Sequence, residues 1–224
     1  MEIADPIAHP LQLATEPLVR GTALADLARL YDPDVMVVTA PTAPGPGVLR
    51  HAAALADGGP RQLKAEVPTP GGVPDPGALA SLARHDADDA DAWIAYLEEV
   101  ATVFAHLLDA REVGVRQVVA DGPHCPRFHV DQVLARGVLN VLGSCTEWLG
   151  EADVDRGLLG HAGGADDATS GLVRAWGRLG RAELGALTVF KGTAWPGAEE
   201  RAVVHRSPPP NGERRVVLTL DWLD

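Results

Sequence analysis

The sequence has few cysteines, few aromatic residues and no excess of basic side chains. Its 224 residues include only Cys125 and Cys145, which cannot build a disulfide framework and therefore favour a reducing compartment. There are 31 aspartate and glutamate residues against 19 lysine and arginine residues, which gives a formal net charge of −12. Nucleic acid is not expected as a general partner, because phosphate binding needs a basic surface.

The sequence also lacks long apolar segments and a secretory signal. No run approaches the roughly 18–20 apolar residues that cross a bilayer. The first residues, Met1 to Asp5, contain neither the basic region nor the apolar core of a signal peptide. We therefore expect a cytoplasmic protein that does not associate with membranes, and its length suits one sizeable domain.

Residues 1–112 are predicted to form helices and loops that pack on a core. Apolar residues at Trp93, Leu97 and Val100 recur at helical spacing and predict the strongest helix of the chain over residues 91–110. A short apolar run over residues 34–39 predicts a buried strand. Proline and glycine interrupt much of the remaining sequence in this region, which is typical of loops.

Residues 113–224 have the pattern of a β core. Short apolar segments alternate with turns rich in glycine, proline and asparagine, and this arrangement is typical of a sandwich or barrel. The segments lie at residues 113–119, 136–142, 187–190, 202–205 and 215–220. The sequence therefore predicts a single α+β domain in which N-terminal helices pack on a β core.

His129, Asp131 and His205 are candidate metal ligands. Residues two apart in a strand share a face, with Cα atoms roughly 6.6–7 Å apart, so the side chains of His129 and Asp131 can converge on one divalent ion. His205 follows another predicted strand and would complete a set of two histidines and one carboxylate. The alternatives are a structural His–Asp hydrogen bond and a strand-end histidine that caps a turn with Ser207.

Arg215 is a candidate anchor for a carboxylate ligand. It comes ten residues after His205, and the turn between them allows it to return on a neighbouring strand. A guanidinium can hold a carboxylate through two parallel hydrogen bonds. An ion pair with an acidic residue is the alternative, and Arg214 replaces Arg215 if the register shifts by one residue. Arg136 and Lys191 are further candidates for binding an anion, unless they are solvated or ion-paired.

Cys125 and Cys145 permit other interpretations of the site. Cys125 precedes His129 by four residues, which is about 13 Å along a straight strand, so sharing one ion requires a sharp bend at Pro126. A Cys125–Cys145 pair acting as a redox or second metal site also remains open.

Several linked motifs resemble those of a known bacterial family. The chain is similar to the family catalogued as domain of unknown function 1826, in motif detail over roughly residues 100–224. The shared motifs are Cys125 to Asp131, Thr146 to Leu149, Lys191-Gly192, Trp195 to Gly197, Val204 to Pro208 and Leu218 to Asp221. The order of His-x-Asp, a distal histidine and a basic residue ten positions on also resembles Fe(II)/2-oxoglutarate oxygenases of the prolyl-4-hydroxylase type. The Arg-x-Ser pair of many such enzymes is missing after Arg215.

The resemblance implies a fold and an activity. The fold would be a double-stranded β-helix, of the jelly-roll or cupin-like kind, over residues 113–224. His129, Asp131 and His205 would hold Fe(II), with zinc as an alternative ion, and Arg215 would bind 2-oxoglutarate, assisted by Arg136 and Lys191. The activity would be that of a hydroxylase-type dioxygenase, acting on a small molecule or a protein.

Two alternatives and an assembly state also follow from the resemblance. The family's association with zinc-homeostasis genes implies a role under metal limitation. The first alternative is therefore a non-catalytic protein of zinc or iron homeostasis that uses the same ligands. The second is a cupin-like scaffold whose site has become a pocket for small anions. A homodimer is compatible with such a fold, since many β-helix proteins pair through their outer strands.

Overall fold

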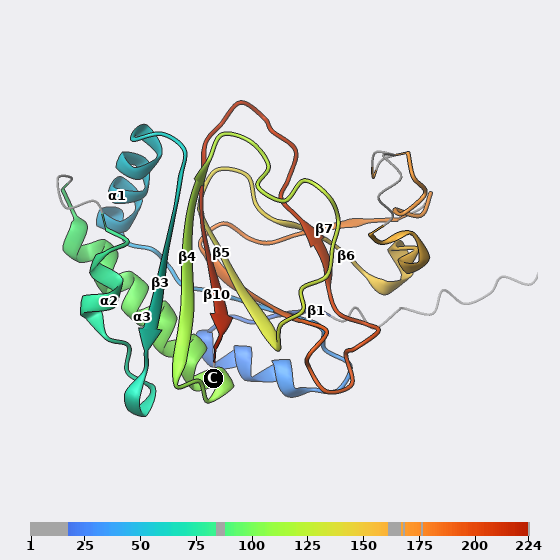
Figure 1. The fold of residues 1–224 in the computed structure, drawn as a ribbon, viewed down its shortest axis with the longest axis horizontal. Coiled ribbons are helices and arrows are strands. Elements are labelled where there is room, and N and C mark those ends of the chain that lie inside the picture. The colour runs from blue at the N-terminus through green and yellow to red at the C-terminus, as the bar shows by residue number, and fades with distance from the viewer. Residues whose placement is uncertain (1–17, 84–87, 161–166, 168, 176, 224) are drawn as a thin grey trace, which may run out of the picture.

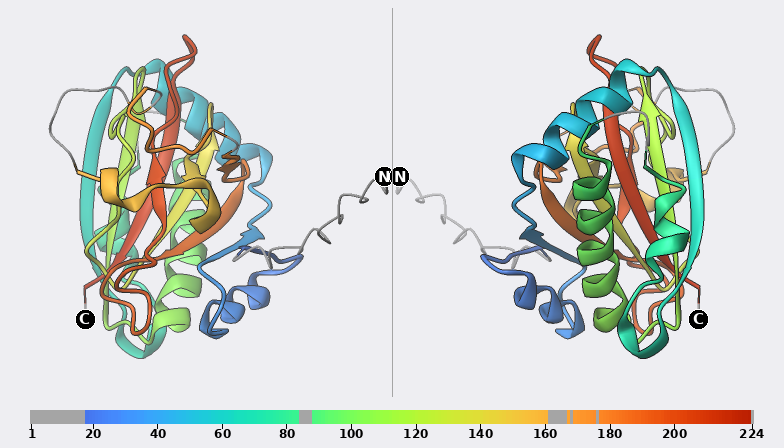
Figure 2. Two further views of the ribbon diagram at one scale, coloured as in Figure 1. Left: turned by 90° about the vertical axis from the view of Figure 1, so that its right-hand side faces the viewer. Right: turned by 90° about the vertical axis from the view of Figure 1, so that its left-hand side faces the viewer.

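The computed structural model describes residues 18–83, 88–160, 167, 169–175 and 177–223. Residues 1–17 of the predicted N-terminal region lie outside this part of the chain. The described residues form an α+β fold in which helices cover one face of a large β-sheet and a smaller sheet lies on the other side (Figures 1 and 2). No helix among them is long and apolar enough to cross a membrane.

The large sheet has seven strands. In spatial order these are β1 (Leu18–Arg20), β2 (Val37–Pro41), β8 (Ala186–Lys191), β5 (Ala135–Leu142), β10 (Arg215–Trp222), β4 (Glu112–Ala120) and β3 (Arg61–Pro68). β1 and β2 are parallel, and every other pair is antiparallel. β10 therefore lies inside the sheet, between β5 and β4, where both of its edges are hydrogen-bonded.

The small sheet contains three strands, which lie opposite the large one. Their order is β7 (Leu179–Arg181), β6 (Glu147–Leu149) and β9 (Val204–Arg206). An isolated antiparallel bridge joins His129 to His205, so the segment around His129 runs beside β9. The two sheets meet where the ring of Phe190 on β8 stacks on that of His205, with ring centroids 5.1 Å apart.

Helices pack on the opposite face of the large sheet, as Figure 2 shows. These helices are α1 (Pro46–Asp57), α2 (Pro76–Ala80) and α3 (Ala90–Leu108). The chain also contains short 3₁₀ helices, which are η1 (Leu24–Tyr31), η2 (Pro70–Gly72), η3 (Glu151–Asp153) and η4 (Arg156–Leu158). On α3, the buried Trp93 donates its indole hydrogen to Gln117 on β4 over 3.0 Å. Phe104 packs so closely on β5 that a Cβ atom at Gly137 would lie 3.1 Å from its ring.

The alternation of side chains along β10 gives the sheet its two faces. Val216, Leu218 and Leu220 are buried in the core cluster that includes α1 and α3. Arg215, Val217 and Thr219 point the other way and line a cavity between the sheets. One short strand thus carries both the packing face of the core and the polar face of the site.

The structure confirms the predicted helix over residues 91–110 as α3 and the predicted strand over residues 34–39 as β2. The five strands predicted after residue 112 are also present, as β4, β5, β8, β9 and β10. Residues 1–112 contribute more strand than predicted, since β1 and β3 join the large sheet in addition to β2. Exposed and covered residues alternate along β3, and this period of two was its sequence signal.

Candidate metal centre

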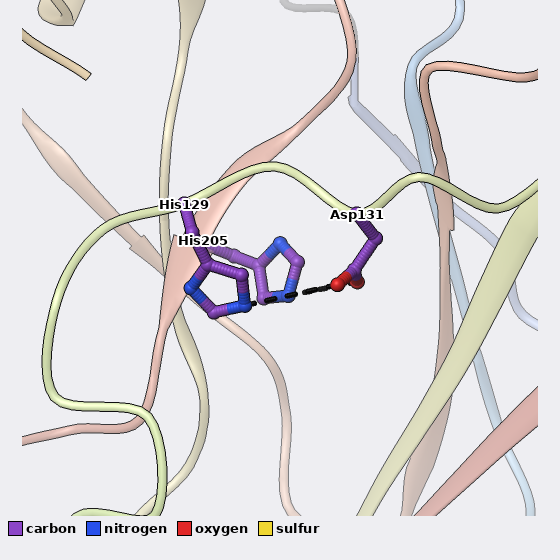
Figure 3. Close-up of side chains that lie close together, drawn as sticks. All are labelled: His129, Asp131 and His205. Atoms are coloured by element: carbon purple, nitrogen blue, oxygen red, sulfur yellow. Dashed lines mark ion pairs between the residues drawn. The ribbon is translucent and has the colours of Figure 1, made fainter. Parts of the chain in front are cut away.

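The side chains of His129, Asp131 and His205 converge on one point (Figure 3). Their potential ligand atoms all lie within 4.8 Å of one another. Nε2 of His205 is 3.1 Å from Oδ2 of Asp131, and Nε2 of His129 is 3.7 Å from Oδ1. The bridge between the two histidines consists of reciprocal backbone hydrogen bonds of 3.0 and 2.9 Å. The predicted ligands are therefore brought together by strand pairing.

Each histidine ring is oriented by its own chain segment. Nδ1 of His129 lies 2.9 Å from the carbonyl oxygen of Arg127, and Nδ1 of His205 lies 3.1 Å from that of Val203. Because a carbonyl oxygen can only accept a hydrogen bond, each ring donates from Nδ1. In the neutral rings Nε2 therefore carries a lone pair, and this is the tautomer in which metal-bound histidines are usually held.

Asp131 is fixed by Arg136, which bridges two carboxylates. Nη1 of Arg136 donates to Oδ1 of Asp131 over 2.7 Å. The same guanidinium donates twice to Asp221 on β10, over 2.7 and 3.0 Å. Arg136 thus orients the proposed metal ligand instead of remaining free for an external anion.

The remaining oxygen of Asp131 provides a test of whether a metal fits. Oδ2 is buried and has no hydrogen-bond donor among the described residues. When the His205 ring is neutral its Nε2 offers a lone pair, and two acceptors then face each other across 3.1 Å. Two ligands at about 2.1 Å from one ion, at roughly a right angle, stand about 3 Å apart. The donor set therefore fits a divalent ion.

Charges around the site favour the protonation states that bind metal. Burial alone would raise the pKa of Asp131, but contact with His205 and the positive charge of Arg136 outweigh it, and the pKa falls to about 2. Burial lowers the pKa of His129, and the nearby His205 lowers it further. An ionised carboxylate beside a neutral imidazole is the form that coordinates a metal ion.

A cavity that is partly open to solvent is lined by His129 and His205, and its solvent-accessible volume is about 70 Å³. Arg215 lines it and is only 5% exposed. Its Nε donates to the carbonyl of Ser144 over 2.8 Å, and its Nη2 approaches Oδ1 of Asn140 at 3.3 Å. Within the described part of the chain no carboxylate contacts this guanidinium. Burial lowers the pKa of Arg215, because removal from water disfavours the charged form.

The structure does not bring every predicted residue to the cavity. The ammonium of Lys191 lies 3.2 Å from the carbonyl oxygen of Asp32 and 4.9 Å from the centre of the Trp195 ring, away from the cavity lining. Arg214 donates to the carbonyl of Ala56 on α1, so the register places Arg215, not Arg214, on the cavity side.

The two cysteines are both free. Cys125 is exposed and lines the mouth of the cavity, where its backbone N–H donates to the hydroxyl of Ser207 over 3.2 Å. Cys145 is half-buried, and burial raises the pKa of its thiol. Neither sulfur belongs to the group of side chains that converges at His129 and His205.

Sequence reasoning missed Asp221 and Arg116. Asp221 holds Arg136, and its signal was its position on β10, on the same face as Arg215. Arg116 lies on β4 and lines the cavity. It is placed there by the pairing of β4 with β10, which no local pattern reveals.

Several solved structures share the fold of this chain. An Arabidopsis thaliana dioxygenase for auxin oxidation, in complex with 2-oxoglutarate, matches with a TM-score of 0.55 and 9% identity, covering 93% of this chain and 92% of that one. The rice dioxygenase for auxin oxidation gives 0.51 and 13%, covering 93% and 83%. A full-length Neurospora crassa protein, crystallised in complex with alpha-KG, gives 0.52 and 10%, covering 92% and 84%. At these identities the likeness shows a shared fold.

The family is shown by the sequence itself. The model described as "Protein of unknown function (DUF1826)" matches residues 21–221, and the chain belongs to this family. No curated protein matches the chain.

Proposed function

We propose that this protein is an Fe(II)- and 2-oxoglutarate-dependent oxygenase of the hydroxylase type. The observation that carries the proposal is the pairing of a three-ligand centre with a buried arginine in one cavity. Asp131 Oδ2 has no donor among the described residues, and Arg215 has no carboxylate there. The likeness in fold to a dioxygenase solved in complex with 2-oxoglutarate supports the same conclusion.

The ligands and the arginine have separate roles in this proposal. His129, Asp131 and His205 would hold Fe(II), as two histidines and one carboxylate do in iron oxygenases. The iron would supply the oxidation chemistry, in which O2 gives one oxygen atom to the substrate and the other to the succinate that forms as 2-oxoglutarate loses CO2. Arg215 binds the distal carboxylate, and Ser144 and Asn140 hold its guanidinium in place. Arg136 keeps Asp131 oriented, and the partly closed cavity limits the access of water.

The arrangement of the strands supports a double-stranded β-helix. β4, β10, β5 and β8 form one layer, and β7, β6, β9 and the segment around His129 form the other. Both layers fall within residues 112–223, one residue from the proposed division of the chain at 112/113, and this supports that division. Residues 1–112 then extend one layer with three further strands and cover it with helices.

Anaerobic titration tests the proposal. Protein loaded with Fe(II) is titrated with 2-oxoglutarate, and the weak visible band of the metal–cosubstrate complex is followed. Loss of a hydrogen-bonded charge typically weakens binding about 10- to 100-fold, and we expect this for Arg215→Met. Arg214→Met is the matched control, because Arg214 points to α1, and it should leave the titration unchanged. Tight zinc binding with no response to 2-oxoglutarate would contradict the proposal and favour a role in metal homeostasis.

A further inference from the structure

Arg116 and Thr219 are neighbours in the cavity, and each has a buried polar atom without a hydrogen-bond partner among the described residues. They are direct partners in the register of β4 and β10, and both line the cavity. Nε of Arg116 and Oγ1 of Thr219 are buried and have no hydrogen-bond partner among the described residues. Buried polar groups are usually paired, and those left unpaired in a folded protein call for an explanation such as an absent ligand.

Some of the positive charges that line the cavity are paired with carboxylates, and others are not. Four arginines line it, and two of them are held by carboxylates: Arg136 by Asp131 and Asp221, and Arg206 by Glu147. Arg116 and Arg215 contact no carboxylate in the described part of the chain. Since the chain has 31 acidic residues, a shortage of carboxylates does not explain the two uncompensated cations.

The two uncompensated arginines mark different positions along β10. Thr219, the partner of Arg116, is four residues from Arg215, or about 13 Å along the strand. In the other direction Thr219 is two residues from Asp221, which holds Arg136, and Arg136 in turn holds the metal-ligand candidate Asp131. The pair of Arg116 and Thr219 therefore lies towards the end of β10 that is connected to the metal ligands.

We propose that Arg116 and Thr219 bind a carboxylate group of the primary substrate, so that the substrate class is an organic acid with an apolar body. The inference rests on the proposed function, which assigns Arg215 to the cosubstrate. One guanidinium and one hydroxyl match a singly charged carboxylate, whereas a phosphate monoester carries nearly two charges at neutral pH. Val118, Val138 and Val217 line the same cavity and suit an apolar body.

Calorimetry on the 224-residue chain, loaded with zinc and saturated with 2-oxoglutarate, tests this assignment with phenylacetate as the probe. Phenylacetate should bind more tightly than its neutral amide. Arg116→Met should weaken phenylacetate about 10- to 100-fold, and Thr219→Val about 2- to 10-fold. Both variants should leave the affinity for the amide and for 2-oxoglutarate unchanged. Arg116→Lys keeps the positive charge but lacks the two parallel N–H donors of a guanidinium. It should therefore lose less affinity for phenylacetate than Arg116→Met does.

Lys64→Met is the matched control for the loss of one positive charge. Lys64 is the register partner of Arg116 on β3, but its side chain is exposed and does not line the cavity. Its removal should change the affinity for phenylacetate by less than about threefold, because exposed charges contribute little.

Several results would overturn the inference. These are no phenylacetate binding up to about 10 mM, equal losses in Arg116→Met and Lys64→Met, and tighter binding of phenyl phosphate than of phenylacetate. A loss of 2-oxoglutarate affinity in Arg116→Met but not in Arg215→Met would show that Arg116 anchors the cosubstrate.

The same titrations without 2-oxoglutarate separate the two proposals. If the wild type binds no 2-oxoglutarate yet binds phenylacetate through Arg116, the oxygenase is refuted and an acid-binding site remains.

Discussion

Replacing His205 by glutamine should abolish stabilisation by metal while leaving the fold intact. An ion that binds only the folded state stabilises it by about 2.7 kcal/mol when its concentration is 100 times its dissociation constant. For a domain of this size each kcal/mol raises the melting temperature by about 2–4 °C. With Co(II) at that concentration, the wild type should therefore melt about 5–11 °C higher than the metal-free protein.

The effect of the substitution on the metal-free protein is separable from this shift. His205→Gln removes the ring that stacks on Phe190, and aromatic pairs of this kind contribute about 0.5–1.5 kcal/mol. The glutamine amide is also a possible donor to Oδ2 of Asp131, which has none among the described residues. The metal-free variant should accordingly melt only slightly below the wild type.

Thermal unfolding with and without Co(II), together with the visible spectrum of the bound ion, measures both quantities. His106→Gln is the matched control, because His106 lies exposed on α3, where its Nδ1 lies 2.9 Å from the backbone carbonyl oxygen of Thr102. The reasoning is refuted if His205→Gln retains the Co(II)-induced shift, or if His106→Gln loses it to the same extent.

Two further predictions concern the core and the response to acid. Gly137→Ala should destabilise the protein by about 1–3 kcal/mol in urea unfolding, because the new methyl group would lie 3.1 Å from the Phe104 ring; unchanged stability would show that α3 moves away at little cost. The lowered pKa of Asp131, about 2 against an ordinary 3.8, should stabilise the metal-free protein by about 2 kcal/mol above pH 4, and this contribution is lost as the pH falls towards 2. The stability difference from Asp131→Asn should therefore shrink on acidification, and a constant difference would contradict the assignment.

The sequence was informative where the chemistry depends on local spacing. His129 and Asp131 share a face because they are two residues apart, and Arg215 points into the cavity because the alternation along β10 is fixed by its apolar residues. The helix α3 followed from its apolar spacing. These features need only the geometry of a single element.

What the sequence did not reveal depends on contacts between distant segments. Arg136 was expected to assist an external anion, but it donates two hydrogen bonds to Asp221, which lies 85 residues further along the chain. Lys191 was expected near an anion, but the packing of β8 turns it towards Trp195. Arg116 enters the cavity through the pairing of β4 with β10. Residue type alone does not determine which charged groups will face each other.

The backbone bridge between His129 and His205 has a consequence for metal exchange. Strand pairing holds these two residues together although 76 positions separate them in sequence, so the site does not need an ion to assemble it. An ion entering such a prearranged site orders little of the chain, and its affinity then follows the general ranking in which Fe(II) binds more weakly than zinc or copper. The metal carried by the protein would reflect what the cell supplies, and iron occupancy would depend on keeping free zinc scarce.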